Sequence, residues 1–198
     1  MVRFYSTHSL FIFFGLLFNV SCNRPKDPKD PDARKTKSEF ETVIQKSDSV
    51  WQAMITSDNN KISNMKRLVV ELGNISEKQS QNMVQTDTLI NKLLTVRYDR
   101  ETMKTSGLID QYDSVTNRAI FALRQEIQTN PEAVKYQIIS QLASEIQQAD
   151  DSILYFRKEY DRKIDAYNLY VKKNKKEITK NISQNEGLKK YYVFRLTP

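Results

Sequence analysis

The stretch that decides the fold is residues 38–74, which read SEFETVIQKSDSVWQAMITSDNNKISNMKRLVVELGN. Its apolar side chains return every three or four residues, at Phe40, Val43, Ile44, Val50, Trp51, Met54, Ile55, Ile62, Met65, Leu68, Val69 and Leu72. Because this spacing places them on one face of an α-helix, the stretch predicts a long amphipathic helix. Ser38 is the expected N-cap, and Gly73-Asn74 is the expected stop.

The same period continues toward the C-terminus. It predicts helices over about 76–104 and 108–128, then a long helix after Pro131 whose apolar face runs from Val134 to Val171. Residues 191–194 predict a short extended tail. Helices joined by short loops bury such faces against one another. We therefore expect an all-α domain over 39–198, an antiparallel four-helix bundle with long helices and a short C-terminal tail.

The N-terminus predicts export and lipid attachment. Leu10–Val20 is an apolar run of eleven residues, which is typical of a signal peptide and short for a membrane span. It ends at Ser21-Cys22, which resembles the acylation site of bacterial lipoproteins. We expect residues 1–21 to be a lipoprotein-type signal peptide, Cys22 to carry the lipid, and residues 22–38 to be a flexible tether. An uncleaved anchor helix remains the alternative.

Composition excludes several kinds of chemistry. The chain of 198 residues has one His, one Cys and four Gly. His8 precedes the apolar run, so removal of the signal peptide would leave no histidine for a catalytic triad or a zinc site. The glycines form no phosphate-binding loop. We expect no cofactor and no catalytic residue.

The net charge of +7 is unevenly distributed. Residues 39–171 contain 16 basic and 19 acidic residues, whereas residues 172–190 contain seven basic and two acidic ones. The C-terminal lysines are candidates for contact with an anionic surface: Lys172, Lys173, Lys175, Lys176, Lys180, Lys189 and Lys190. No aromatic-interleaved basic motif accompanies them, so nucleic acid is not expected as a partner.

Two other groups could carry chemistry. The densest carboxylates are Glu145, Asp150, Asp151, Glu159 and Asp161, a residue type suited to acid–base work or to a hard cation. Sequence neighbours point to different sides of a helix, which favours a solvated face. The tyrosines at 160 and 167 lie two turns apart, and we expect them, with Trp51, to be core residues.

The chain resembles the LemA family of bacterial envelope proteins in two blocks. The first has Trp51, Asn60-Lys61 and Leu68-Val69 at the family spacing, although Lys66-Arg67 stands where the family has Pro-Asn. The second begins at Pro131-Glu132 and continues through Arg157, Tyr160-Asp161 and Tyr167-Asn168. The resemblance implies an antiparallel bundle of long helices and supplies no catalytic residue.

Together these features predict a non-catalytic module in the bacterial cell envelope. It would be anchored in a membrane, would face outside the cytoplasm, in the periplasm or at the cell surface, and would bind an unidentified envelope protein or act as a scaffold. Two alternatives remain open: a carboxylate-based envelope hydrolase, and a bundle that binds lipid or a small ligand. Neither the choice of inner or outer membrane nor the oligomeric state follows from the sequence.

Overall fold

The computed structural model describes residues 31–75, 81–182 and 188–194. Within these ranges every regular element is a helix and no strand occurs. The α-helices there are α1 (Pro31–Asn74), α2 (Gln81–Thr95), α3 (Ser106–Thr129), α4 (Gln137–Asp151) and α5 (Ile153–Asn181). Short 3-10 helices, η1 (Thr102–Lys104) and η2 (Ala133–Lys135), precede α3 and α4. The predicted all-α class is confirmed.

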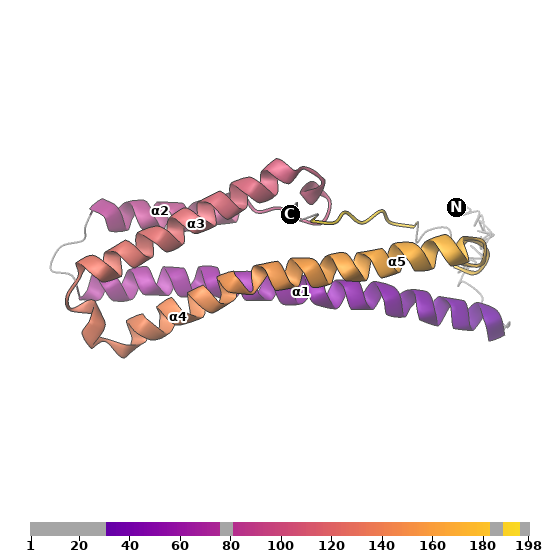
Figure 1. Ribbon diagram of the computed structural model, residues 1–198, viewed down its shortest axis with the longest axis horizontal. Coiled ribbons are helices and arrows are strands. Elements are labelled where there is room, and N and C mark those ends of the chain that lie inside the picture. The colour runs from indigo at the N-terminus through magenta and orange to yellow at the C-terminus, as the bar shows by residue number, and fades with distance from the viewer. Residues whose placement is uncertain (1–30, 76–80, 183–187, 195–198) are drawn as a thin grey trace, which may run out of the picture.

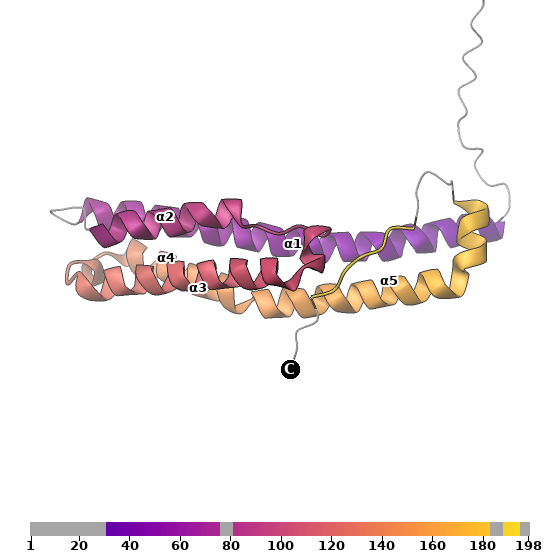
Figure 2. The ribbon, with the colours of Figure 1, turned by 90° about the horizontal axis from the view of Figure 1, so that it is seen from above.

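The molecule is elongated, and α1 runs along its whole length (Figure 1). Helices α4 and α5 follow one another antiparallel to α1, and both pack against it. Helices α2 and α3 pair with each other and cover only one half of α1 (Figure 2). The other half therefore consists mainly of α1 and α5, with the C-terminal tail lying along them.

Helix α1 begins at Pro31, seven residues before the predicted N-cap at Ser38. Pro31 suits the first helical turn because it has no N–H to leave unpaired, and Asp32 adds a favourable charge there. Ala33 is already buried, with 2% of its surface exposed. Residues 31–38, expected to be tether, are thus helical, while the rest of that segment and Cys22 lie outside the described residues.

Helix α2 ends at Thr95, nine residues short of the predicted end. The side-chain oxygen Oδ1 of Asp99 accepts the backbone N–H of Glu101 at 2.9 Å and that of Thr102 at 2.8 Å. Such local bonds offer the backbone an alternative to the helical ladder. They shape the connection between α2 and α3, residues 96–105, which contains η1. We call this connection the η1 corner.

The long fourth helix of the prediction begins later and is divided. The extended residue Tyr136 separates η2 from α4, and Ser152 separates α4 from α5. Beyond the predicted apolar face, Asn174 lies inside α5 with φ −111° and ψ 19°. At this bend the Asn174 side-chain amide donates to the carbonyl of Tyr170 at 3.0 Å. Beyond this bend the last turns of α5 point toward the N-terminal end of α1 (Figure 2).

Two groups of buried apolar residues stabilise the fold. The main core extends through all the α-helices and includes Trp51 and Tyr160. A smaller core at the bent end joins Phe40, Tyr167, Ile178 and Ile182. The tail forms no strand among residues 188–194, but Phe194 is buried against the rings of Trp51, Tyr98 and Tyr160.

Candidate functional site

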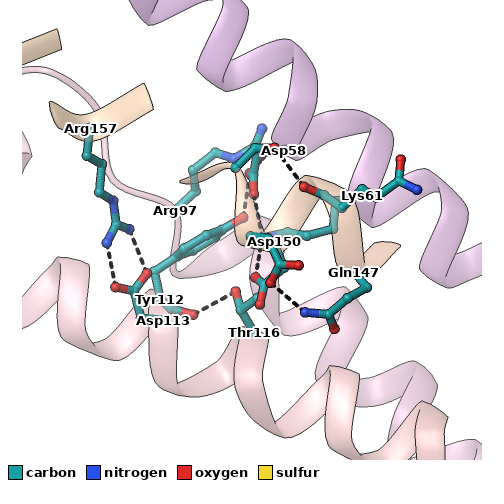
Figure 3. A network of polar contacts seen from close by, with 12 residues as sticks. Asp58, Lys61, Arg97, Tyr112, Asp113, Thr116, Gln147, Asp150 and Arg157 are labelled. Carbon is teal, nitrogen blue, oxygen red and sulfur yellow. Dashed lines mark hydrogen bonds and ion pairs between the residues drawn. The ribbon is translucent and has the colours of Figure 1, made fainter. Parts of the chain in front are cut away.

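A network of buried charges links α1, the loop after α2, α3 and α4 (Figure 3). Asp58 on α1 is 7% exposed, and it pairs with Lys61 at 3.3 Å and with Arg97 at 2.7 Å. The Tyr112 hydroxyl of α3 donates to the same carboxylate at 2.5 Å, while Lys61 reaches Asp150 of α4 at 3.3 Å. Two carboxylates thus face two cations, and the set is electrically balanced.

Because its charges are balanced, the network has a structural role. Lys61 is only 2% exposed, so removal of its charge would leave two carboxylates with less compensation in a water-poor site. Burial, followed by the charge of Asp58 and the hydrogen bond to it, raises the pKa of Tyr112 well above its usual range. The hydroxyl therefore stays protonated and donates at every physiological pH. The network fixes how α1, α3 and α4 sit against one another.

A second buried cation joins α5 to α3. Arg157 is 3% exposed and contacts both oxygens of Asp113 at 2.7 Å each (Figure 3). It also donates to the Tyr98 hydroxyl at 3.0 Å, and its guanidinium lies 5.1 Å from the ring centroid of Phe194. A bidentate pair with this geometry is rigid and directional. Arg157 thus positions α5, α3 and the C-terminal tail together.

A third arginine, Arg100, sits among aromatic rings beside the tail. Its guanidinium lies 5.2 Å from the ring centroid of Trp51, 5.5 Å from that of Tyr160 and 5.4 Å from that of Tyr191. It also pairs with Asp48 at 2.5 Å. Cations over aromatic faces in partly buried sites are stabilised electrostatically. Arg100 therefore connects the η1 corner to α1 and to the tail.

A groove of about 940 Å³ opens next to Arg100. It lies where α2 and α3 no longer cover α1, so its walls are α1, the η1 corner, Tyr167 of α5 and the tail. Its apolar surface comes from Phe40, Ile44 and several tyrosines. The full lining is Phe40, Glu41, Ile44, Gln45, Asp48, Arg100, Glu101, Lys104, Tyr167, Lys189, Lys190, Tyr191 and Tyr192. Its mixed lining suits a ligand with both apolar and charged groups.

The Tyr160 hydroxyl, near this groove, has no hydrogen-bond partner in the described part of the chain. The residue is fully buried, and burial raises its pKa to about 12. Arg100, Asp48 and Tyr191 are near enough to influence that pKa, and all three line the groove.

Tyr160 and Tyr167, the two tyrosines predicted to be core residues, are both buried, and so is Trp51, as predicted.

The predicted lysines lie in two places. Lys172, Lys173, Lys175, Lys176 and Lys180 are exposed on both sides of the bend in α5. Lys189 and Lys190 lie on the tail and line the groove instead. The seven lysines predicted as one cluster therefore form two groups in the structure, five on α5 and two on the tail.

The carboxylates singled out in the sequence are all engaged by neighbours. Asp151 accepts from Gln147 at 2.6 Å, Glu145 from Asn64 at 2.9 Å, and Glu159 pairs with Arg162 at 2.8 Å. Asp150 pairs with Lys61, and Asp161 accepts the backbone N–H of Phe194 at 2.8 Å. These acids do not converge on one cleft.

The described ranges hold neither a metal-ligand cluster nor a membrane-spanning helix. No three His, Cys, Asp or Glu side chains there gather as a metal ion would require. Every helix in the same ranges is too short or too polar to cross a bilayer. Comparisons with protein-family models, with curated proteins and with solved structures give no match.

Sequence reasoning missed the groove and the buried cations. The groove depends on where α2 ends, and α2 ends just before the turn at Asp99. The sequence signal of that turn is an Asp followed by a Thr three residues later. Periodicity assigns charged residues to the solvent, so Lys61 and Arg157 gave no sign of burial beyond their place in the family resemblance.

Proposed function

We propose that this chain is a lipid-anchored protein of the bacterial envelope whose helical body binds a partner protein and catalyses no reaction. The observation that carries the proposal is the position of the basic lysines. The N-terminal end of α1 and the bent end of α5 lie at the same end of the molecule (Figure 2). Cys22 would therefore be joined to the molecule at the end where the lysines gather.

Distance supports this arrangement. Eight residues, 23–30, separate the start of α1 from the expected lipid site, and the nine Cα–Cα steps between Cys22 and Pro31 span at most about 30 Å. An acylated Cys22 would keep the basic end within reach of the bilayer surface. Each lysine near an anionic surface contributes about 1 kcal/mol. Exposed Arg34 and Lys35 of α1 lie at this end too.

We also propose that the arrangement is an antiparallel four-helix bundle of the LemA type, in which α4 and α5 together form the fourth helix. Residues that carry the resemblance support this reading, because they come together in the core. Trp51 of the first block packs on Tyr160 of the second, with ring centroids 5.3 Å apart. Lys61 and Arg157 are the buried cations of the two ion-pair networks.

The anchor is tested by labelling cells with a palmitate analogue. We expect the wild-type chain to take up label and to remain with membranes, and Cys22→Ala to lose both. A wild-type chain that carries no label would refute the lipoprotein proposal.

The basic end is tested by flotation with vesicles of phosphatidylglycerol and phosphatidylcholine. Replacing Lys172, Lys175 and Lys176 by Gln should weaken binding at least tenfold at low salt. The matched control replaces three exposed lysines elsewhere: Lys46, Lys92 and Lys158. Equal losses in both triple variants would show that net charge alone matters and would overturn the assignment of this end.

A further inference from the structure

The C-terminal tail is held by α5 at two points, with four residues between them. The Tyr167 hydroxyl donates to the carbonyl of Lys189 at 3.1 Å, and the N–H of Phe194 donates to Asp161 at 2.8 Å. Between these points the backbone groups of residues 190–193 make no hydrogen bond with any described residue. The tail therefore presents a row of N–H and C=O groups that could pair with another chain.

Side-chain contacts indicate that this row is extended. The Lys190 ammonium lies 5.5 Å from the ring centroid of Tyr192, two residues along, as side chains on one side of an extended segment do. Tyr191, between them, packs edge-on against Tyr167 of α5, with ring centroids 5.0 Å apart. Tyr191 and Tyr192 thus have different ring and cation neighbours, and an extended backbone is the geometry that strand pairing requires.

The groove beside the tail has an excess of unpaired positive charge. Lys104, Lys189 and Lys190 form no ion pair with any residue that the structure describes. Among the lining acids, Asp48 is paired with Arg100, and Glu41 lies 3.8 Å from Lys37. Glu101 is thus the one lining carboxylate without a cation in the described ranges, against three unpaired lysines. A ligand that carries several carboxylates would restore the balance.

We propose that the tail and the groove bind an extended acidic peptide segment of a partner protein. The segment would pair with residues 190–193 as an added strand, place alternate apolar side chains against Phe40 and Ile44, and set its carboxylates near the three lysines. This inference names the partner of the proposed interaction module, and it rests on that proposed function.

The first test uses a fluorescent hexapeptide of alternating Glu and Leu and its Lys-Leu counterpart, titrated with the purified full chain in nonionic detergent. We expect the acidic peptide to bind, and the basic one to bind at least tenfold more weakly. Replacing Lys104, Lys189 and Lys190 by Gln should reduce affinity about tenfold, since each exposed pair contributes little alone. The control replaces exposed Lys92, Lys158 and Lys173 by Gln and should bind as the wild type does.

The second test addresses the backbone pairing. Two acidic peptides are N-methylated, one at its odd amides and the other at its even amides. Because only every second amide of an added strand faces the tail, one peptide should lose binding and the other should keep it. Equal affinity of the two methylated peptides would refute strand pairing, and absence of binding by the unmethylated peptide would refute the site. Peptide binding is measured without a membrane, so it can succeed even if lipid labelling of Cys22 fails.

Discussion

Two buried tyrosines give a sharp test, because the same substitution should change stability in opposite directions. Tyr112 and Tyr160 are 4% and 0% exposed. The Tyr112 hydroxyl donates to Asp58 at 2.5 Å, whereas the Tyr160 hydroxyl has no partner in the described structure. Replacing each by Phe removes one oxygen and keeps the ring. The packing contribution is therefore nearly constant between the two variants.

The magnitudes follow from the partners. A hydrogen bond to a charged group contributes about 1.5–3 kcal/mol, so Tyr112→Phe should lower the free energy of unfolding by about 2 kcal/mol. A buried hydroxyl without a partner costs about 1–3 kcal/mol, so Tyr160→Phe should raise the free energy of unfolding by about 1 kcal/mol. For a body of this size, each kcal/mol corresponds to about 2–4 °C in melting temperature.

Alkaline pH adds a second signature for Tyr160. Its pKa rises from 10.0 to about 12 on folding, so the folded state favours the neutral phenol. That contribution is fully present below pH 10 and is lost as the pH rises toward 12, by about 2–3 kcal/mol in all. The stability advantage of Tyr160→Phe over the wild type should therefore increase across this window.

The assay is urea unfolding followed by circular dichroism and by the fluorescence of Trp51, the single tryptophan. Measurements at neutral pH give the sign of the stability change in each variant. A series up to pH 12 gives the pH dependence of the difference between Tyr160→Phe and the wild type. A loss of more than about 1 kcal/mol in Tyr160→Phe would show that the hydroxyl is bonded, and would refute the reasoning. A neutral Tyr112→Phe would remove the structural role assigned to the Asp58 network.

Three further changes test the remaining contacts by thermal unfolding. Lys61→Met keeps the buried stem but removes the charge, and should cost about 3 kcal/mol, whereas exposed Lys92→Met should cost less than about 0.5 kcal/mol. Phe194→Ala should cost about 3 kcal/mol because three rings surround it, and a cost no larger than that of Phe121→Ala, at a position 64% exposed, would contradict burial of the tail. Asp99→Ala should cost about 1 kcal/mol, and an unchanged melting temperature would count against the turn at η1.

The sequence predicted the elements that depend on apolar periodicity. The all-helical class and the burial of Trp51, Tyr160 and Tyr167 follow from side chains that repeat with the helical period. Those residues contribute through area removed from water, which depends on spacing and hardly on distant partners. The lipid site at Cys22 and the surface role of the lysines remain predictions.

What the sequence could not predict depends on partners far apart along the chain. Lys61 is buried because Asp150, 89 residues away, lies opposite it. Phe194 is buried because the short α2–α3 hairpin leaves space that the tail occupies. The break at Ser152 leaves the local ladder nearly intact and has no strong signal in residue type. Each of these outcomes is decided by tertiary packing after the helices have formed.

The two cores described above differ in size, and this difference sets how the molecule opens. The smaller core at the bent end has four buried residues, whereas the main core is formed by all five α-helices. Local opening requires the loss of only the contacts of the unit that opens, so the bent end should exchange its amide hydrogens faster than the rest. At this end, which carries most of the basic lysines, α1 and α5 can then separate while the main core stays folded. Opening at this end would thus leave the main core covered.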